Sequence, residues 1–420
     1  MQFSQALKGY CHKKVLLFFI LGLSCGVPLN LIGNTLALWT TEKGIDLKII
    51  GLFSMMMLPY SFKFLWAPFI DRVRLPFSRK IGHKKIWGLL FQAGLMLSIL
   101  CLSFFKPDAQ ITTLFFFALL AAFFAASQDI VVDALRIDTL EGDALKEGSS
   151  LYQFGYRTGM LLSGAGLIAL SNVIEWGQCY RLAALLIAMG AIALLLVEEP
   201  SFKPSRSLTL KELILSPLTD FMHRHQLWLQ LIIFIVLYKI CNAVLGRMAY
   251  PFYTQIGFSK NEIALISGAI GPWITIAGVF LGGLFMLRFG YFKSLFYLGF
   301  FEILTSVAYA VLAHLGNNVY AFFGVILFDN IIGGMGGAVF VGFLSSLCAR
   351  AYSATQYALL TSVTMIAVSF IASISGYLAS SLGWIAFFLL TGVLMLPALF
   401  LLHYMMKVSD EKSAKNNQAA

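Results

Sequence analysis

The chain has 420 residues, of which 59% are apolar and only 12% are charged, and it contains 38 Phe and 36 Gly. Soluble domains are about 45–50% apolar with glycine counted, and about 25% charged. This composition therefore excludes a water-soluble fold, a disordered chain, a collagen-like chain and a small disulfide scaffold. The formal net charge of +10 does not indicate nucleic-acid binding, because most basic residues lie in short stretches between apolar runs.

Twelve apolar runs are long enough to span a bilayer, which takes about 20 largely apolar residues in a helix. The first run is too long for the apolar core of a signal peptide and lacks a small-residue cleavage site, so we interpret it as a span. The twelve predicted spans cover residues 15–39, 48–70, 86–105, 112–135, 149–172, 180–197, 226–250, 261–287, 294–313, 319–343, 357–380 and 383–404. The sequence therefore predicts an all-α polytopic membrane protein.

A polar stretch with three prolines, residues 198–225, divides the spans six and six. We expect residues 1–197 to form an N-terminal six-helix bundle and residues 226–404 a C-terminal six-helix bundle. The stretch between them is then a cytoplasmic linker, and residues 405–420 form a cytoplasmic tail. Two such bundles are typical of the major facilitator fold, with 12 transmembrane helices and a substrate site near the middle of the membrane.

The Lys and Arg residues are distributed unevenly over the loops. With a cytoplasmic N-terminus, the cytoplasmic segments hold 21 of them and the outer loops hold five. Loops rich in Lys and Arg remain in the cytoplasm when a membrane protein inserts. The sequence therefore predicts that both termini lie in the cytoplasm.

The loop after the second predicted span carries Asp71-Arg72, followed by Arg79-Lys80. This pattern resembles the acidic and basic cytoplasmic motif of the major facilitator superfamily. Asp133 lies near the cytoplasmic end of the fourth span. We expect Asp71, Arg72 and Asp133 to act in gating or to hold the helices together at this end.

Charged residues inside the predicted spans are candidates for function, because each costs at least about 2.5–3.5 kcal/mol to place in a bilayer. They are Lys63, Asp129, Asp133, Arg157, Lys239, Arg247, Glu302 and Asp329. At about 1.5 Å per helical residue, Lys63, Asp129 and Arg157 lie at a similar depth, which predicts an ion cluster. Lys239 and Asp329 both fall near the midplane and predict a second cluster.

A buried carboxylate that keeps a base ionised releases that base when it is protonated. Asp129, Asp329 and Glu302 are therefore candidates for proton coupling, and the alternative is that they form structural ion pairs. Hydroxyls and amides such as those of Ser127 and Gln128 supply hydrogen bonding without charge, which suits recognition of sugars or amides. The candidate substrate-binding residues are Asn30, Asn34, Tyr60, Lys63, Ser127, Gln128, Tyr156, Arg157, Tyr238, Lys239, Asn242 and Asn330.

The sequence gives no basis for an enzyme. All six His lie in loops or at span ends, and the six Cys are scattered without a Cys-x-x-Cys pair. No buried base is therefore available to activate a Ser or Cys, and no spacing of metal ligands occurs. We expect no catalytic residue, no metal and no cofactor.

Several motifs together resemble the AmpG-type muropeptide permeases of the major facilitator superfamily, over nearly the whole chain. They are Gly26-Val-Pro-Leu-Asn30, Thr35-Leu-Ala-Leu-Trp39, Gly44-Ile-Asp-Leu-Lys48, Phe62-Lys-Phe-Leu-Trp-Ala-Pro68, Ser127-Gln-Asp-Ile-Val-Val-Asp-Ala134, Tyr156-Arg-Thr-Gly-Met160, Gly333-Gly-Met-Gly336 and Ala354-Thr-Gln-Tyr-Ala-Leu-Leu360. The resemblance implies proton-coupled import of anhydro-muropeptides, N-acetylglucosaminyl-anhydro-N-acetylmuramyl peptides released in cell-wall turnover. It places the protein in the bacterial inner membrane, in peptidoglycan recycling.

The chain departs from the family pattern at three points. The family usually has Lys-x-Gly-Asp in the seventh span, where this chain has Lys239-Ile-Cys-Asn242. A Glu-Asn pair of the family is Asp329-Asn330 here, and a Lys in the eighth span is Gly268. The lost acid and the lost base suggest a diverged relative, for which a different cargo is an alternative.

Two alternatives remain open beside the muropeptide importer. One is an importer of another anionic solute, an acetyl-CoA-like or sugar-peptide cargo, on the same scaffold. The other is a membrane sensor that transports nothing, which is disfavoured because the polar stretches are short. The expected partners are the small-molecule substrate, protons and the lipid bilayer, without nucleic acid, and the expected state is a monomer.

Overall fold

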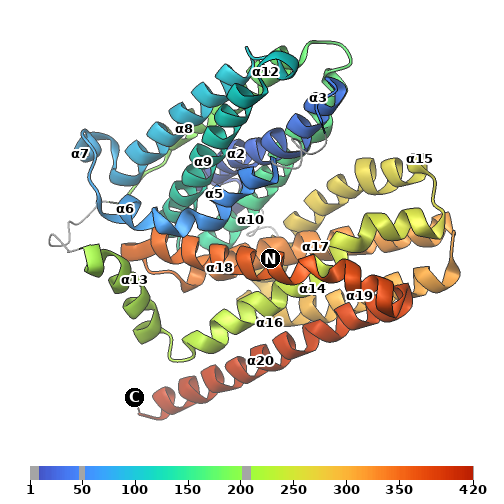
Figure 1. Ribbon diagram of the computed structural model, residues 1–420. Helices are drawn as coiled ribbons and strands as arrows, with labels where there is room; N and C mark the ends of the chain where they lie inside the picture. The colour runs from blue at the N-terminus through green and yellow to red at the C-terminus, as the bar shows by residue number, and fades with distance from the viewer. Residues whose placement is uncertain (1–8, 47–52, 201–209, 420) are drawn as a thin grey trace. The chain divides into compact units, whose positions relative to one another are not determined.

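The computed structural model describes residues 9–46, 53–200 and 210–419, and in these residues every regular element is a helix (Figure 1). The chain divides into two compact units. Unit 1 comprises Met1–Thr219 with Leu344–Ser362, and unit 2 comprises Asp220–Phe343 with Val363–Ala420. Residues 201–209 of the predicted linker and residue 420 of the predicted tail lie outside the described residues, and the predicted bundle boundaries remain predictions.

Unit 1 is built from long helices interrupted by short turns of other helix types. Its elements within residues 9–200 are α2 (Lys13–Asn30), η1 (Leu31–Thr35), α3 (Leu36–Glu42), η2 (Phe53–Met57), α5 (Leu58–Phe62), η3 (Lys63–Leu65), α6 (Ala67–Arg72), α7 (Ser78–Ile81), α8 (His83–Leu102), α9 (Pro107–Thr139), α10 (Gly142–Leu161), η4 (Leu162–Gly166), α11 (Leu167–Leu170) and α12 (Trp176–Leu196). The segments η1 and η4 are π-helical.

Unit 2 continues the all-helical pattern, and α13 (Leu210–Arg224) leads into it. Its elements are α14 (Trp228–Ile256), α15 (Lys260–Ile263), η5 (Ala264–Ile270), α16 (Gly271–Leu315), α17 (Val319–Leu347), α18 (Ser353–Ser373), α19 (Ser375–Leu382) and α20 (Trp384–Ala419). The end of α17, the short η6 (Arg350–Tyr352) and the first half of α18 belong to unit 1.

The described helices are consistent with the twelve predicted spans. Nine of them are long and apolar enough to cross a membrane, and one, Lys260–Leu315, contains two predicted spans. These two separate at Gly290, whose φ of 74° and ψ of 178° suit a glycine. The prediction of an all-α protein whose helices are long and apolar enough to cross a membrane is confirmed.

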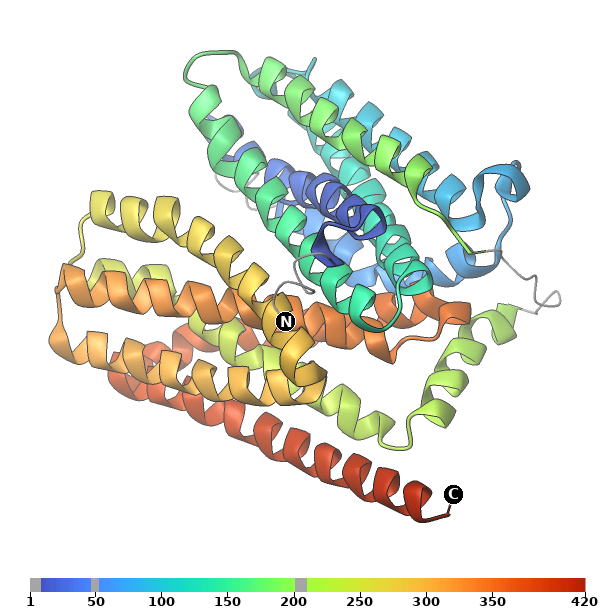
Figure 2. The same cartoon turned by 180° about the vertical axis from the view of Figure 1, so that it is seen from behind.

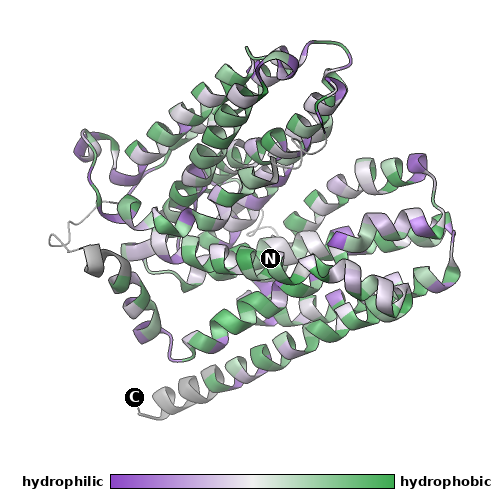
Figure 3. Ribbon diagram, viewed as in Figure 1, coloured by the Kyte–Doolittle hydropathy of each residue, from purple (hydrophilic) through white to green (hydrophobic). Residues whose placement is uncertain are grey.

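The two remaining predicted spans are less regular. The second, residues 48–70, begins outside the described residues and continues through η2, α5, η3 and α6. The fifth, residues 149–172, is formed by α10, η4 and α11, and α10 begins with the polar residues of Gly142–Glu147. Short turns and polar residues reduce the length and hydropathy of these two helical stretches. Figure 3 shows hydrophobic residues (green) along most of the length of the long helices, and hydrophilic residues (purple) at several helix ends and loops.

Small residues let α2 and α10 approach closely, and Figure 2 shows the two helices side by side. A Cβ atom on Gly22 would lie 2.1 Å from the Tyr152 carbonyl oxygen, and one on Gly159 would lie 2.3 Å from that of Leu23. In unit 2, a Cβ on Gly278 would lie 2.4 Å from the carbonyl oxygen of Ile331. Such small-residue contacts replace the hydrophobic driving force that membrane helices lack.

Candidate functional site

Asp129 on α9 lies at the centre of a buried polar cluster in unit 1. Its side chain interacts electrostatically with Lys63 of η3 and with the Cys25 thiol of α2. Asp129 and Lys63 are 6% and 5% exposed. Tyr60 and Tyr156 lie within electrostatic range of Asp129. The structure thus brings together four of the candidate residues, from the second, fourth and fifth predicted spans.

Three polar atoms of this cluster are buried without a hydrogen-bond partner among the described residues. They are Tyr60 Oη, Asp129 Oδ1 and Arg157 Nε. Buried polar groups are nearly always paired in folded proteins, so each exception calls for an explanation such as a ligand or water. Arg157 interacts with Tyr156, but an ion pair between Arg157 and Asp129 is not among those of the described residues. We call Tyr60, Lys63, Asp129, Tyr156 and Arg157 the Asp129 cluster.

Ser127 and Gln128 precede Asp129 on α9, are fully buried and hold helices together. Trp66 Nε1 donates to Ser127 Oγ at 3.0 Å, and Gln128 Nε2 donates to Ser24 Oγ of α2 at 3.0 Å. The Gln128 Oε1 atom has no hydrogen-bond partner among the described residues. Their predicted contact with substrate remains a prediction.

The predicted residues of the first span lie at a π-helical segment. Asn30 Nδ2 donates to the Met160 carbonyl oxygen at 2.8 Å, and Thr35 Oγ1 donates to that of Ser163, also at 2.8 Å. These bonds join the ends of η1 to the η4 region of the fifth span. Asn34, within η1, is exposed. Single π-turns inside helices occur frequently at functional sites, so the position of Asn34 suits substrate contact.

Unit 2 holds a second set of buried acids. Asn242 Nδ2 donates to Glu302 Oε1 at 3.1 Å, and Tyr309 Oη donates to Asp329 Oδ2 at 2.9 Å. The sequence predicts an ion pair between Lys239 and Asp329. Asp329 accepts its hydrogen bond from Tyr309, and Lys239 interacts electrostatically with Glu302. The ion pair between Lys239 and Asp329 stays a prediction.

Aromatic rings and hydroxyls surround the remaining candidates of unit 2. The Lys239 Nζ atom lies 4.4 Å from the centroid of the Phe340 ring, and Tyr238 stacks on the same ring at 5.8 Å. Asn330 Oδ1 accepts a hydrogen bond from Thr275 Oγ1 at 2.6 Å, so Asn330 ties α17 to α16. Within the described residues there is no group of three or more His, Cys, Asp or Glu arranged to hold a metal ion.

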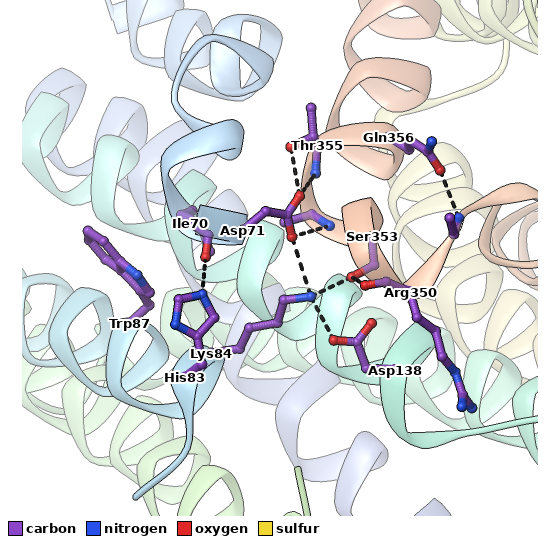
Figure 4. Close-up of polar contacts among 12 residues, drawn as sticks. Ile70, Asp71, His83, Lys84, Trp87, Asp138, Arg350, Ser353, Thr355 and Gln356 are labelled. Carbon is purple, nitrogen blue, oxygen red and sulfur yellow. Dashed lines mark hydrogen bonds and ion pairs between the residues drawn. The ribbon is translucent and has the colours of Figure 1, made fainter. Parts of the chain in front are cut away.

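Asp71 forms the core of a second cluster in unit 1, at the start of α18 (Figure 4). Thr355 donates to Asp71 Oδ2 through its backbone nitrogen at 2.8 Å and through Oγ1 at 2.7 Å. The Ala354 nitrogen donates to Oδ1 at 3.3 Å. These are first-turn N–H groups of α18, which have no partner inside the helix, and a carboxylate there also interacts favourably with the helix dipole.

Lys84 on α8 completes this second cluster. Its Nζ lies 3.4 Å from Asp71 Oδ1 and 2.6 Å from Asp138 Oδ2, and it donates to Ser353 Oγ. The side chains of Lys84 and Asp71 are 5% and 2% exposed. We call Asp71, Lys84, Asp138, Ser353 and Thr355 the Asp71 cluster. The sequence analysis identifies only Asp71 of these five as a candidate, and Thr355 enters it only as part of the Ala354–Leu360 motif.

The other predicted gating residues also contact the Leu344–Ser362 segment. Asp133 Oδ1 lies 2.8 Å from Arg136 Nη1, and the fully buried Arg136 donates to Ser345 Oγ at 3.0 Å. The Arg136 guanidinium also stacks over the Tyr357 ring at 5.4 Å. Arg72 lies 4.9 Å from the Tyr352 ring centroid. Each of the three predicted gating residues therefore reaches this segment, directly or through Arg136.

Comparison with protein families matches residues 15–372 to the model of the Major Facilitator Superfamily. A putative transporter AmpG 4 of Rickettsia conorii is 34% identical over 394 residues, which cover 92% of this chain and 95% of the relative. The anhydromuropeptide permease of Escherichia coli K12 is 34% identical over 401 residues, which cover 95% of this chain and 81% of the relative.

Two solved structures share the fold at low sequence identity. The proton:xylose symporter XylE, bound to 6-bromo-6-deoxy-D-glucose, aligns with a TM-score of 0.67 at 13% identity, over 96% of each chain. A bacterial homologue of the iron transporter ferroportin, in the outward-facing state, aligns with a TM-score of 0.66 at 16% identity. That alignment covers 94% of this chain and 98% of the homologue.

Proposed function

Because the chain belongs to the AmpG-type permeases of the Major Facilitator Superfamily, we propose that it imports anhydro-muropeptides together with protons. Membership of this family makes it a multi-pass membrane transporter and not an enzyme. The observation that carries the proposal is the Asp129 cluster, which holds two bases, two tyrosines and an acid inside unit 1. A relative of 34% identity is named an anhydromuropeptide permease. The membrane is the bacterial inner membrane, and the importer works as a monomer with both termini in the cytoplasm.

The chemistry of the cluster matches the proposed cargo. Lys63 and Arg157 supply positive charge for the peptide carboxylates of a muropeptide, and an Arg binds a carboxylate with two parallel hydrogen bonds. The Tyr60 hydroxyl, which has no hydrogen-bond partner in the part of the chain that the structure describes, supplies a hydrogen bond for a sugar hydroxyl or an N-acetyl group. Tyr156 adds an aromatic face beside Arg157.

Proton coupling in this proposal acts through Asp129. While ionised, Asp129 attracts Lys63 and competes with the cargo for that base. Protonation removes the negative charge and leaves Lys63 free to bind a substrate carboxylate. Binding of a proton and binding of the anionic cargo then favour each other, which is the thermodynamic requirement for symport.

The Asp71 cluster serves as a gate in this proposal. Its ion pairs and hydrogen bonds hold the start of α18 against α6 and α8 within unit 1. A transporter that alternates access must break such contacts once in each cycle. The lipid bilayer surrounds the exposed apolar side chains of the spans.

A second candidate cargo, another anionic solute, is favoured by Gly268. The resembling family has a Lys at this position, and Gly268 lies in the π-helical η5, where a Cβ would meet only the Ile263 carbonyl oxygen at 4.0 Å. The position therefore has room for a side chain, so a steric clash does not account for the missing base. Its absence instead changes which substrate the transporter selects.

Counterflow into proteoliposomes tests the cargo. Vesicles loaded with unlabelled anhydro-muropeptide should take up the labelled compound through the purified protein, and excess acetyl-CoA should not compete. Arg157→Ala should abolish this exchange, while Arg181→Ala, which removes an exposed base of the same unit, should leave it intact. Competition by acetyl-CoA, together with exchange of labelled acetyl-CoA, would transfer the assignment to the second candidate.

A further inference from the structure

A line of buried hydroxyls leads to Asp329 in unit 2. Tyr309 Oη donates to Asp329 Oδ2 at 2.9 Å, and Tyr253 Oη lies 2.8 Å from Tyr309 Oη. Tyr253 is 2% exposed and Tyr309 is 0% exposed. A phenol carries a single O–H proton. Since Tyr309 gives its proton to Asp329, Tyr253 must donate to Tyr309, and both hydrogen bonds point toward the carboxylate.

The three groups come from three helices whose ends meet at one end of unit 2. Asn317 Nδ2, between α16 and α17, donates to the carbonyl oxygen of Gly257 at the end of α14, at 2.9 Å. At about 1.5 Å per residue, Tyr253 lies about 5 Å from the end of α14, Tyr309 about 9 Å from the end of α16, and Asp329 about 15 Å from the start of α17. The hydroxyls are thus successive steps from this end of the unit to the middle of a span.

Aromatic rings surround the two phenols. Phe388 lies 5.0 Å from the Tyr309 ring, Phe322 lies 4.8 Å from the Tyr253 ring, and the two tyrosine rings stack at an angle of 16°. Phe322 and Phe388 are fully buried. In such apolar surroundings an unpaired hydroxyl costs about 1–3 kcal/mol, so the two hydroxyls keep their partners and form a continuous hydrogen-bonded path.

The path ends beside a second acid. Glu302 on α16 interacts electrostatically with Asp329 and with Lys239, and accepts a hydrogen bond from Asn242. Cys241 on α14 also lies within electrostatic range of Asp329. Two carboxylates in a medium of low dielectric constant disfavour joint ionisation, whereas Lys239 offsets the charge of one of them. Glu302 and Asp329 can therefore bind one exchangeable proton between them.

We propose that Tyr253 and Tyr309 form a relay that delivers a proton to Asp329 from the outer end of α14. This inference deepens the proposed proton-coupled transport and rests on it. A proton binds Tyr253 Oη while the original Tyr253 proton moves to Tyr309 Oη, and the original Tyr309 proton forms a new O–H bond on Asp329. Each tyrosine again has one proton, the carboxylate has become a carboxylic acid, and nothing is oxidised or reduced.

Tyr253→Phe and Tyr309→Phe test the relay, because each removes one hydroxyl and keeps the packed ring. Two matched controls are Tyr250→Phe, at a 56% exposed tyrosine of the same helix, and Tyr180→Phe, which removes a buried hydroxyl of unit 1 that donates to the Leu31 carbonyl oxygen. Infrared spectroscopy after a pH jump on the purified protein follows the carboxylic-acid band of Asp329, identified by its loss in Asp329→Asn.

We expect the Asp329 band to appear at least tenfold more slowly in Tyr253→Phe and Tyr309→Phe, and at the wild-type rate in both controls. Equal rates in all four variants would overturn the relay. Absence of any Asp329 band in the wild type at every pH tested would also overturn it, because the acid would then not accept the proton.

Transport assays separate a wrong relay from a wrong cargo. In proteoliposomes, the two relay variants should keep muropeptide counterflow and lose accumulation driven by a proton gradient. The infrared experiment needs no cargo. If the wild type transports no muropeptide while the two relay variants still slow the band, the cargo is wrong and the relay stands. If the wild type accumulates muropeptide and the variants show unchanged band kinetics, the relay is wrong and the proposed function stands.

Discussion

Asp71→Asn should loosen the start of α18, because Asp71 accepts three hydrogen bonds from its first residues. The substitution keeps the shape of the side chain but removes its charge. It breaks the ion pair with Lys84 and weakens the hydrogen bond that the side chain accepts from the Thr355 nitrogen. Hydrogen bonds to charged groups contribute about 1.5–3 kcal/mol, and breaking one partner of a buried ion pair costs about 3–5 kcal/mol. Because Lys84 keeps Asp138 as a partner, we expect a loss of about 2–4 kcal/mol for this contact.

Hydrogen exchange measures this loss directly. First-turn amides of a helix have no acceptor inside the helix, so protection of the Ala354 and Thr355 amides depends on Asp71. A loss of about 3 kcal/mol corresponds to roughly a hundredfold faster exchange, at about 1.4 kcal/mol per factor of ten. Asp143→Asn is the matched control, since it breaks a pair with Lys146 in which the acid is 72% exposed. Unchanged exchange at residues 353–362 in Asp71→Asn would refute the reasoning.

Three further predictions concern packing, a buried base and coupling. Gly22→Ala should destabilise the detergent-solubilised protein by about 1–3 kcal/mol in thermal melts, because the new Cβ would lie 2.1 Å from the Tyr152 carbonyl oxygen. Gly33→Ala is the control and should not destabilise it, since nothing lies within 4 Å of a Cβ at that position. Equal melting temperatures for the two variants would contradict the α2–α10 contact. Arg136→Ala should cost about 3–5 kcal/mol by leaving Asp133 buried without its partner, and a melting temperature equal to that of Arg181→Ala would refute this. Asp129→Asn should keep counterflow and lose proton-driven accumulation, so an Asp129→Asn protein that still concentrates cargo would disprove coupling at this acid.

The spans and the fold class were predictable because one physical rule, the length of apolar helix that crosses a bilayer, acts on each segment separately. The rule applies least clearly to the second and fifth spans, where short turns and the polar start of α10 interrupt the run of apolar helical residues. Family membership was predictable from motifs that lie together in the sequence. Both results depend on local features of the chain.

Contacts between helices were harder to predict, because they depend on the rotation of each helix as well as on depth. The hydrogen bonds from Tyr309 to Asp329 and from Asn242 to Glu302 depend on such rotations, and depth in the spans did not predict them. Lys84 was missed for another reason. A base at the start of a span resembles a solvated loop charge, and only the fold places Asp71 and Asp138 around it.

The most direct test of the account is proton movement driven by the cargo alone. Proteoliposomes that hold the purified protein, with no gradient imposed, are given anhydro-muropeptide while the external pH and the entry of label are recorded together. The account predicts that the outside medium becomes more alkaline as the label enters, and that a protonophore abolishes the pH change. Entry of label without any alkalinisation would contradict proton coupling, and no entry into vesicles holding folded protein would contradict the cargo.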